Sequence, residues 1–236
     1  MSRISFVMPT KNRQDLIGES IKSIINQTEK DWELIIVDDH SDEGDKTEEV
    51  VKSFADDRVK YFKLKDENGL GIAAARNFGN QMASSDIIAV MDSDDLAYPE
   101  RAEVTLAEFN KGGIDIVYAK IHMWYPETNK IENRPENFEA RDFNLEDFKL
   151  HDFIPHSTSA YKRKIALEFP YNSFFRMAED YDMFSRMYVH KYNFSFINKH
   201  LVKYRVHDDQ VMHKAGFSFK YALMVVENRG WNAEEK

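Results

Sequence analysis

Short runs of strand-forming apolar residues alternate with amphipathic stretches over the first half of the chain, and this pattern limits the fold more than any other feature. It is typical of βαβ units, in which a crossover helix returns the chain to a parallel strand. The predicted strands are Ile4–Met8, Leu34–Val37, Val59–Leu64, Ile87–Met91 and Ile114–Tyr118. The predicted helices are residues 16–25, Lys46–Ala55, Gly71–Ser84 and Pro99–Lys111. We therefore predict an α/β fold with a mainly parallel central sheet flanked by helices.

The composition excludes several classes of protein. The 236 residues include 41 acidic and 32 basic side chains, a net charge of -9, which argues against a nucleic-acid-binding surface. The chain has no cysteine, so disulfides, thiolate nucleophiles and cysteine-ligated metals are excluded. Its apolar runs fall far short of the roughly 20 residues of a membrane span, and the first run, before Pro9, is too short for a signal peptide. We expect a soluble, cytoplasmic protein without a transmembrane span.

The pattern changes after about Tyr118, where aromatic residues and charged loops become more frequent. The polar stretch Pro126–Arg141 is interpreted as a lid or an acceptor-side loop. A helix is predicted over Glu179–Lys191, strands over Phe194–Ile197 and Leu201–Val206, and a terminal amphipathic helix over Phe217–Arg229. No linker is rich enough in Gly, Pro or Ser to separate two domains, so we expect both halves to share one sheet.

Polar residues follow the first two predicted strands at the edge of the sheet where α/β proteins bind ligands. Pro9, Thr10, Asn12 and Arg13 lie at the end of the first strand, and Asp38 and Asp39 end the second. A carboxylate in such a place could accept a hydrogen bond from the N3–H of a uracil or a similar base. The alternative is an Asx-type turn that caps the next helix.

A small-residue segment precedes the third predicted helix. Gly69 and Gly71 lead into a run of alanines that ends at Arg76, so the helix could pack closely and approach a phosphate with its N-terminus. The segment lacks the third glycine of the dinucleotide fingerprint and does not follow the first strand, which argues against a hydride-transfer enzyme. Arg76 could pair with a diphosphate or form an ordinary surface ion pair.

The sequence Asp92-Ser93-Asp94-Asp95 follows a buried strand directly. Three carboxylates within four residues are unfavourable there unless a cation neutralises them, and Mg²⁺ and Mn²⁺ prefer oxygen ligands. This favours a metal site over a solvated acidic turn. The spacing does not continue into an EF-hand loop.

Two further groups could complete such a site. Glu179 and Asp180 begin a predicted helix, where acids are stabilised by the macrodipole, and one of them could act as a general base beside a metal-bound diphosphate. His207 stands at the end of the last predicted strand, and its role as a ligand depends on the acidic cluster lying nearby.

In this order, the motifs resemble those of family 2 glycosyltransferases of the GT-A fold. The matching pieces are SFVMPTKNR, SIINQTEKDWELIIVDDHS, GLGIAAARNFG, MDSDD, AEDYDMFSRM and YRVH, which span about Ile4 to His207. The resemblance implies one GT-A domain over residues 1–236, with a nucleotide-binding half (1–118), an acceptor-binding half (119–210) and a C-terminal helical segment (211–236).

The resemblance also assigns roles to residues. It implies that Asp180 is the catalytic base and that Glu179 either supports it or binds the acceptor. It also implies that Mn²⁺ or Mg²⁺ is held by Asp94, with Asp92 and His207 around it. The nucleotide diphosphate would contact the remaining group, Pro9, Thr10, Asn12, Arg13, Asp38, Asp39, Arg76, Asp92 and Ser93. Residues 155–159 resemble a strand beneath the acceptor pocket.

The implied activity is the metal-dependent, inverting transfer of one sugar from a nucleoside-diphosphate sugar, with UDP favoured, to a hydroxyl of a glycan, lipid-linked or protein acceptor. Asp208-Asp209-Gln210 stand where the family often has serines, so the closing C-terminal loop could differ from that of the family. The alternatives are a sugar nucleotidyltransferase, which would want a glycine-rich loop after the first strand, and an inactive nucleotide-sugar-binding protein. The stretch Phe217–Trp231 could cover the core, contact the inner face of a membrane or join two copies in a homodimer.

Overall fold

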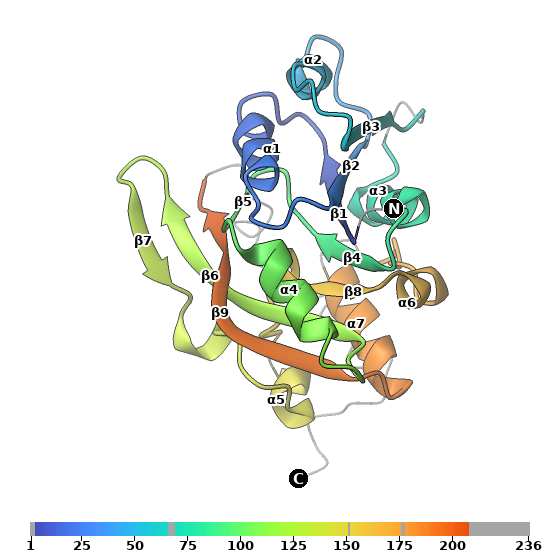
Figure 1. The fold of residues 1–236 in the computed structure, drawn as a ribbon, viewed down its shortest axis with the longest axis vertical. Helices are drawn as coiled ribbons and strands as arrows, with labels where there is room; N and C mark the ends of the chain where they lie inside the picture. Colours follow the sequence, from blue (N-terminus) through green and yellow to red (C-terminus); the bar gives the residue numbers. More distant parts are fainter. Residues whose placement is uncertain (1–2, 66–68, 151, 176–177, 208–236) are drawn as a thin grey trace.

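The computed structural model describes residues 3–65, 69–150, 152–175 and 178–207. Within them the chain forms one sheet of nine strands, in the order β3-β2-β1-β4-β8-β6-β9-β5 with β7 beside β6 (Figure 1). The strands are β1 (Ile4–Thr10), β2 (Trp32–Asp38), β3 (Val59–Lys63), β4 (Ile87–Val90), β5 (Leu96–Ala97), β6 (Ile116–Tyr125), β7 (Lys130–Asn133), β8 (Ala160–Lys162) and β9 (Phe194–Arg205). Both halves of the described chain therefore contribute to a single sheet, as predicted.

The sheet is parallel in its first half and mixed in its second. β3, β2, β1 and β4 pair in parallel, and the register sets Thr10 at the end of β1 opposite Asp38 at the end of β2. Antiparallel pairs join β4 to β8, β6 to β8, β6 to β7 and β5 to β9, while β6 and β9 are parallel. The predicted parallel arrangement thus describes the first half, and short antiparallel strands complete the sheet.

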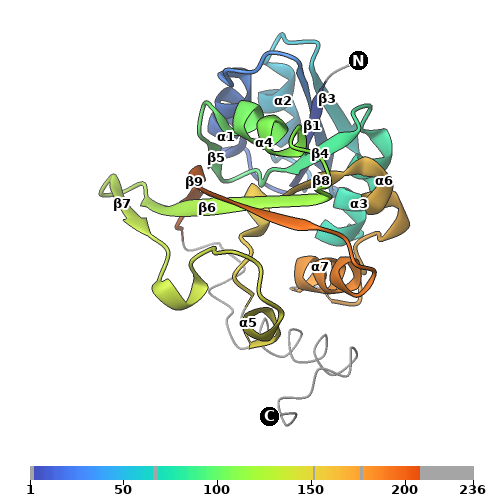
Figure 2. The same ribbon diagram turned by 60° about the horizontal axis from the view of Figure 1, so that its bottom comes forward.

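Helices cover both faces of the sheet, as Figure 2 shows. One face packs against α1 (Ile17–Ile25), α2 (Thr47–Lys52) and α4 (Arg101–Phe109). The other packs against α3 (Ile72–Met82), α5 (Leu145–Leu150), α6 (Arg163–Glu168) and α7 (Glu179–Val189). Every residue of β1 and of β2 is buried, because a strand covered on both faces has no solvent side. Phe6 packs toward α1, and its neighbour Val7 packs toward α3.

Three parts of the second half differ from the prediction. The stretch Pro126–Arg141 contains β7 and a short 3-10 helix, Glu136–Phe138, in place of a plain loop. The segment Pro155–Ser159 is a 3-10 turn centred on His156–Thr158 and not a strand. The hydroxyls of Thr158 and Ser159 donate to the carbonyls of Pro155 and His156, and such local hydrogen bonds favour a turn over a ladder. The predicted strands Phe194–Ile197 and Leu201–Val206 form one continuous strand, β9.

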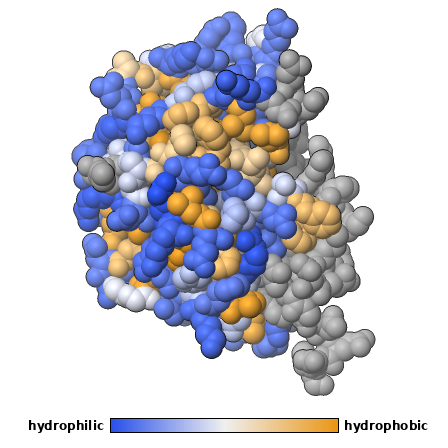
Figure 3. All heavy atoms as spheres, turned by 90° about the vertical axis from the view of Figure 1, so that its right-hand side faces the viewer, coloured by the Kyte–Doolittle hydropathy of each residue, from blue (hydrophilic) through white to orange (hydrophobic). Residues whose placement is uncertain are grey.

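Several helix ends also differ. α4 begins at Arg101, so Pro99 lies in the preceding turn, and α2 ends at Lys52, where the Ser53 hydroxyl donates to the carbonyl of Val50. The predicted helix Phe217–Arg229 lies outside the described residues. Figure 3 shows apolar patches between polar ones on the side of the molecule where α3 and α6 lie. Within the described part of the chain no helix is both long and apolar enough to cross a bilayer.

Candidate active site

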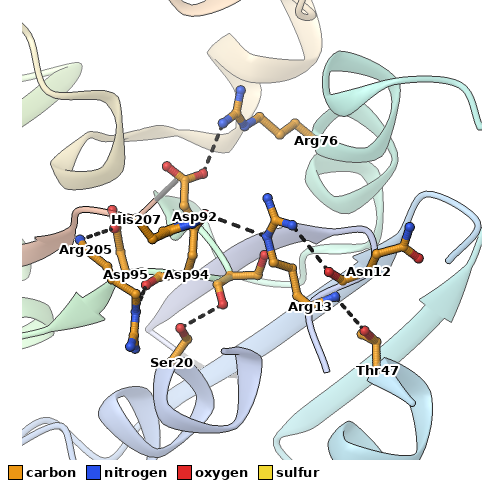
Figure 4. Close-up of polar contacts among 11 residues, drawn as sticks. Asn12, Arg13, Ser20, Thr47, Arg76, Asp92, Asp94, Asp95, Arg205 and His207 are labelled. Carbon is orange, nitrogen blue, oxygen red and sulfur yellow. Dashed lines mark hydrogen bonds and ion pairs between the residues drawn. The ribbon is translucent and has the colours of Figure 1, made fainter. Parts of the chain in front are cut away.

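The carboxyl ends of β1, β2 and β4 lie side by side, and the polar segments that follow them form the candidate site (Figure 4). The Asp39 amide donates to the carbonyl of Thr10 at 2.8 Å, so the two loops stay paired beyond the strands. Thr10 is buried, and its hydroxyl has no partner within the described chain. Pro9 is buried inside β1 opposite Val37. The parallel register therefore brings these predicted residues together.

The loop after β1 is fixed by side-chain contacts to the loop after β2. Asn12, at φ 53°, donates from its amide side chain to Asp42 at 2.8 Å and accepts from the Asp42 amide at 2.8 Å. The Arg13 amide donates to the hydroxyl of Thr47 at 2.8 Å, at the start of α2. The Arg13 guanidinium lies 3.7 Å from the Asp94 carboxylate. Arg13 is thus held where it faces the acidic loop.

Asp38 and Asp39 are engaged in different ways. Asp38 is fully buried; its carboxylate accepts from the Ser41 amide at 2.7 Å and from the Tyr61 hydroxyl at 2.5 Å. Asp39 accepts from the amides of Leu70 and Gly71 at 2.6 and 2.9 Å, directly before α3. The Asp38 carboxylate is therefore engaged by hydrogen bonds within the protein. Asp39 is the member of the pair that orients the loop leading to Arg76.

The acidic loop after β4 brings Asp94 together with His207. The His207 Nε2 lies 3.3 Å from the Asp94 Oδ2, at the point where the chain leaves β9. Asp92 turns instead toward Arg76, so within the described residues no three acidic or His side chains are arranged to hold a metal by themselves. Ser93 is buried, and its carbonyl accepts from the Ser20 hydroxyl of α1 at 2.9 Å.

Asp95 and Arg205 join the acidic loop to the end of β9. Asp95 is fully buried and accepts from the Arg205 amide at 3.0 Å. The Arg205 side chain donates to the Asp94 carbonyl at 2.7 Å and to Glu19 of α1 at 2.6 Å. Burial, together with the charges of Asp94 and Asp92, raises the pKa of Asp95 well above its usual range. This connection places His207 beside Asp94.

A buried cation lies beneath the acidic loop. Arg101 of α4 donates to the carbonyl of Val90 and stacks over the Phe6 ring at 5.4 Å. Burial lowers the pKa of Arg101 to about 10, and the carboxylates of Asp92 and Asp95 oppose that shift. Its charge therefore offsets part of the repulsion among the carboxylates above it.

Arg76 connects the acidic loop to α7. Its guanidinium donates to Glu179 at 2.5 Å and to Asp92 at 3.1 Å, and it lies 5.6 Å from the Tyr171 ring centroid. Burial alone would lower the pKa of Arg76, but the charges of Asp92 and Glu179 raise it overall. Arg76 therefore carries its charge inside the protein, between the two halves of the chain.

The predicted base lies on the same helix. Asp180 is half-buried in the first turn of α7 and accepts from the Tyr181 amide at 2.8 Å. Burial raises its pKa, an effect that Arg76 opposes and the Asp92 charge reinforces. A carboxylate with a raised pKa is a candidate for proton transfer.

Several residues of the site were not predicted from the sequence. Arg205 and Tyr204 belong to the YRVH motif, which pointed only to its histidine. Burial raises the pKa of Tyr204, and the charges of Asp95, Asp92 and Asp94 raise it further. Arg101 carries no sequence signal, because a basic residue in an amphipathic helix ordinarily lies on the solvent side.

Comparisons with known proteins give the family of the chain. The family model described as "Glycosyl transferase family 2" matches residues 5–169. The chain belongs to glycosyl transferase family 2. An uncharacterized glycosyltransferase of Methanocaldococcus jannaschii, MJ1057, is 32% identical over 206 residues, which cover 86% of this chain and 70% of the relative. Both the predicted family and the predicted class of enzyme are confirmed.

A second relative and a solved structure extend the comparison. The Escherichia coli protein "UDP-Glc:alpha-D-GlcNAc-diphosphoundecaprenol beta-1,3-glucosyltransferase WfgD" is 36% identical over 115 residues, 49% of this chain and 44% of that relative. The chain thus spans less than half of its length. The mannosyltransferase PcManGT of Pyrobaculum calidifontis, solved with GDP-Man and Mn²⁺, has a TM-score of 0.76 at 14% identity, over 98% of this chain and 65% of that one. The predicted GT-A fold is confirmed.

Proposed function

We propose that this family 2 protein transfers one sugar, with inversion, from a nucleoside-diphosphate sugar to a hydroxyl acceptor with the help of a divalent metal. The observation that carries the proposal is the bridge made by Arg76, which donates both to Asp92 in the acidic loop and to Glu179 at the start of α7. The bridge connects the loop that would hold the diphosphate to the first turn of α7, which carries Asp180.

The residues present fit a divalent cation that a diphosphate also binds. Mg²⁺ and Mn²⁺ are commonly held by one or two protein side chains together with phosphate oxygens and water. The Asp94 carboxylate and the His207 imidazole, 3.3 Å apart, supply an oxygen and a nitrogen ligand at one place. A bound metal would stabilise negative charge on the departing diphosphate. Asp92, predicted to lie in the surroundings of the metal, would share its carboxylate between those surroundings and Arg76.

The chain's own residues suit the remaining tasks of the reaction. Arg13 and Arg76 present positive charge toward the acidic loop, where a diphosphate would add further negative charge. Asp180 would accept the proton of the acceptor hydroxyl as its oxygen attacks the anomeric carbon from the side opposite the diphosphate. Glu179, fixed by Arg76, would keep the first turn of α7 in place for that transfer.

UDP is the proposed carrier, since Asp39 at the end of β2 could accept from a base N–H through a second lone pair. The E. coli relative is named for UDP-Glc and a diphosphoundecaprenol-linked sugar, whereas PcManGT was solved with GDP-Man. A lipid-linked acceptor would bring the protein to the inner face of a membrane as a peripheral protein in the cytoplasm. A homodimer through the C-terminal segment stays a second proposal.

Two observations argue against a sugar nucleotidyltransferase. The chain belongs to glycosyl transferase family 2, and the loop that follows β1 has no glycine. An inactive nucleotide-sugar-binding protein would keep the same donor contacts. A general base distinguishes the sugar transferase from the inactive binder, because only the enzyme needs a carboxylate such as Asp180 to accept the acceptor's proton.

A nucleotide-sugar screen tests the proposal. The melting temperature should rise with a UDP-sugar only when Mn²⁺ or Mg²⁺ is present, since a ligand that binds the folded form stabilises it. The same donor should then be consumed in the presence of an acceptor. Tight binding of every donor without any turnover would favour the inactive binder, and a response to GDP-sugars alone would replace the proposed carrier.

A further inference from the structure

Tyr171 is a buried aromatic residue to which neither the sequence motifs nor the family comparison assigns a role. It lies in the connection between α6 and α7, just beyond the residues that the family model matches. Only 3% of Tyr171 is exposed to solvent. The helices α3, α6 and α7 pack on the same face of the sheet (Figure 2), and the contacts of Tyr171 reach both α3 and the 3-10 turn at His156.

The side chain of Asn77 fixes the main chain of Tyr171. The Asn77 Nδ2 donates to the Tyr171 carbonyl at 2.9 Å, and the Asn77 Oδ1 accepts from the Tyr171 amide at 2.8 Å. These two bonds use both ends of the amide side chain on a single residue. Asn77 directly follows Arg76 in α3, so the connection is attached to the helix beside the residue that bridges the site.

The Tyr171 hydroxyl is held at the far end of the ring. It lies 2.9 Å from the His156 Nε2 and 2.8 Å from the Tyr161 hydroxyl. Tyr161 is buried on β8, and His156 lies in the turn that precedes this strand. Burial lowers the pKa of His156 well below its usual range, so the imidazole is neutral and can either donate or accept. Hydrogen bonds at the main chain and at the hydroxyl therefore fix the ring at both ends.

The face of this ring is directed at Arg76. The Arg76 Cζ lies 5.6 Å from the ring centroid, within the distance of about 6 Å at which an aromatic face attracts a cation. The two Nη atoms of Arg76 donate to Glu179 and Asp92. The Arg76 Nε is shielded from solvent and has no hydrogen-bond partner within the described residues. The ring thus gives the guanidinium a third contact beside its two carboxylates.

A fixed third contact matters for the reaction proposed above. Glu179 and Asp92 attract the same guanidinium from two sides, and a diphosphate bound at the acidic loop would attract it further. A shift of Arg76 toward that loop would weaken its contact with Glu179 and with the first turn of α7. An aromatic face attracts the cation without adding a charge of its own. A ring fixed at both ends can therefore keep Arg76 between the two carboxylates.

We propose that Tyr171 is a positioning residue, whose ring holds the Arg76 guanidinium in the place where it bridges Asp92 and Glu179. This inference rests on the proposed function and deepens it, because it names a residue that sets the acidic loop against the helix of the base. Tyr171 acts through Arg76 and not by contact with the reacting atoms.

The test removes the ring and compares turnover with donor binding. Tyr171→Leu and Tyr171→Met remove the aromatic face, whereas Tyr171→Phe keeps it. The matched control is Phe169→Leu, because Phe169 is a buried ring at the end of α6 that also has an arginine, Arg186, over its face at 5.9 Å. Arg186 pairs with Asp182 and not with the acidic loop.

Three measurements are made on each protein. Turnover is measured in Mn²⁺ as UDP release from UDP-glucose and from UDP-N-acetylglucosamine, with p-nitrophenyl glycosides of glucose, galactose and N-acetylglucosamine as acceptors. Donor binding is measured by UDP calorimetry in Mn²⁺. Stability is measured by urea unfolding, so that a change in turnover can be compared with a change in folding.

Tyr171→Leu and Tyr171→Met should lower kcat at least about tenfold, because a misplacement of about 1 Å can cost on the order of a hundredfold in rate. Their UDP affinity should stay within about threefold of the wild type, since the ring acts on the bridge and not on the nucleotide. Tyr171→Phe should keep kcat within about threefold of the wild type, because the cation still faces a ring. Phe169→Leu should lose stability through the cavity it creates and keep the wild-type kcat.

A double-mutant cycle in urea tests whether the ring acts on Arg76. Tyr171→Leu is made in the wild type and in the double variant Arg76→Gln, Glu179→Gln, which lacks the cation and its partner. The packing lost with the ring is the same in both proteins, so the difference measures the contact between ring and guanidinium. Tyr171→Leu should lower the folding equilibrium constant about tenfold more in the wild type than in the double variant.

Several results would overturn the inference. They are a kcat of Tyr171→Leu and Tyr171→Met equal to that of Phe169→Leu, an equal loss of kcat in Tyr171→Phe, or equal effects in the two halves of the cycle. Failure of both Tyr171→Leu and Tyr171→Met to fold would also overturn it, because Tyr171 would then act on folding as a whole. A wild type that releases no UDP from either sugar would instead refute the proposed function and remove the basis of this inference.

Discussion

Arg76 of α3 donates to Glu179 of α7 at 2.5 Å, although 103 positions separate the two residues in the sequence. Both side chains are buried, and the same guanidinium reaches Asp92 at 3.1 Å. Because Arg76 connects the acidic loop to the helix that carries Asp180, its position sets the two parts of the site relative to each other.

Replacing Arg76 with Gln should destabilise the protein by about 3–5 kcal/mol, because Glu179 would be left buried without its cation. The double variant Arg76→Gln, Glu179→Gln should regain much of that stability, since both charges are then gone, yet it should not regain activity. Urea unfolding of the wild type and of both variants measures the free energies. If Arg76→Gln were as stable as the wild type, the bridge between Arg76 and Glu179 would not be formed in solution.

Gly69 and Gly71 allow a comparison within one loop. Both have a positive φ, 74° and 85°, which an L-residue adopts at a penalty of about 1–3 kcal/mol. A Cβ at Gly69 would also lie 2.8 Å from the Lys11 Nζ and 3.0 Å from the Asp39 carbonyl, whereas one at Gly71 would meet nothing within 4 Å. Gly69→Ala should therefore weaken UDP binding more than Gly71→Ala. Calorimetry on both variants gives the answer, and equal affinities would contradict the packing described for Asp39.

Most of the first half could be predicted from the sequence. The alternation of apolar runs located β1 to β4, and the polar residues at their ends located Thr10, Asp39 and Asp94, because parallel strands end at one edge. The antiparallel strands were harder. β7 reads Lys-Ile-Glu-Asn, with no apolar run to mark it, and β8 has only three residues.

The buried cations of the site could not be predicted in the same way. Arg101 has no spacing or neighbour that distinguishes it from a solvent-exposed arginine, and its position depends on packing between distant elements. Arg76 was named, but as a contact of a base or diphosphate; its bridge to Glu179 depends on how α3 and α7 lie against the sheet. Side-chain partners across such distances follow from the tertiary fold and not from local sequence.

Glu33 of β2 should make stability depend on pH in the acid range. Burial alone would raise the pKa of Glu33, but hydrogen bonds from Lys60, Ser5 and Ser84 lower it from 4.5 to about 2. Because the folded pKa lies below the unfolded one, this stabilisation is complete above about 4.5 and is lost as the pH falls toward about 2.

Glu33→Gln should remove this dependence and lower stability at neutral pH by about 3 kcal/mol. Chemical unfolding of the two proteins at a series of pH values measures the difference, with Glu43→Gln, at an exposed position, as control. The difference between wild type and Glu33→Gln should shrink between pH 4.5 and 2. A constant difference over this range would rule out the proposed linkage.

Asp180→Asn should separate donor binding from sugar transfer. The amide cannot accept the acceptor's proton, so kcat should fall by about 100-fold to 10,000-fold, the usual contribution of a general base. The affinity for UDP should change by no more than about twofold, because the residue lies on the acceptor side. Steady-state kinetics and UDP calorimetry provide the two readouts. Full activity of Asp180→Asn would assign the base to another residue.

Turnover by Asp94→Asn tests the central claim most directly, since Asp94 is the carboxylate that lies 3.3 Å from His207. Release of nucleoside diphosphate is measured in Mn²⁺. The control is Asp56→Asn, because Asp56 lies outside the acidic loop and pairs with Arg58 at a distance of 2.7 Å. Asp94→Asn should lose at least about a hundredfold in turnover, because metal stabilisation of the departing charge is worth several kcal/mol. Asp56→Asn should stay active. Wild-type turnover by Asp94→Asn in Mn²⁺ would contradict the account.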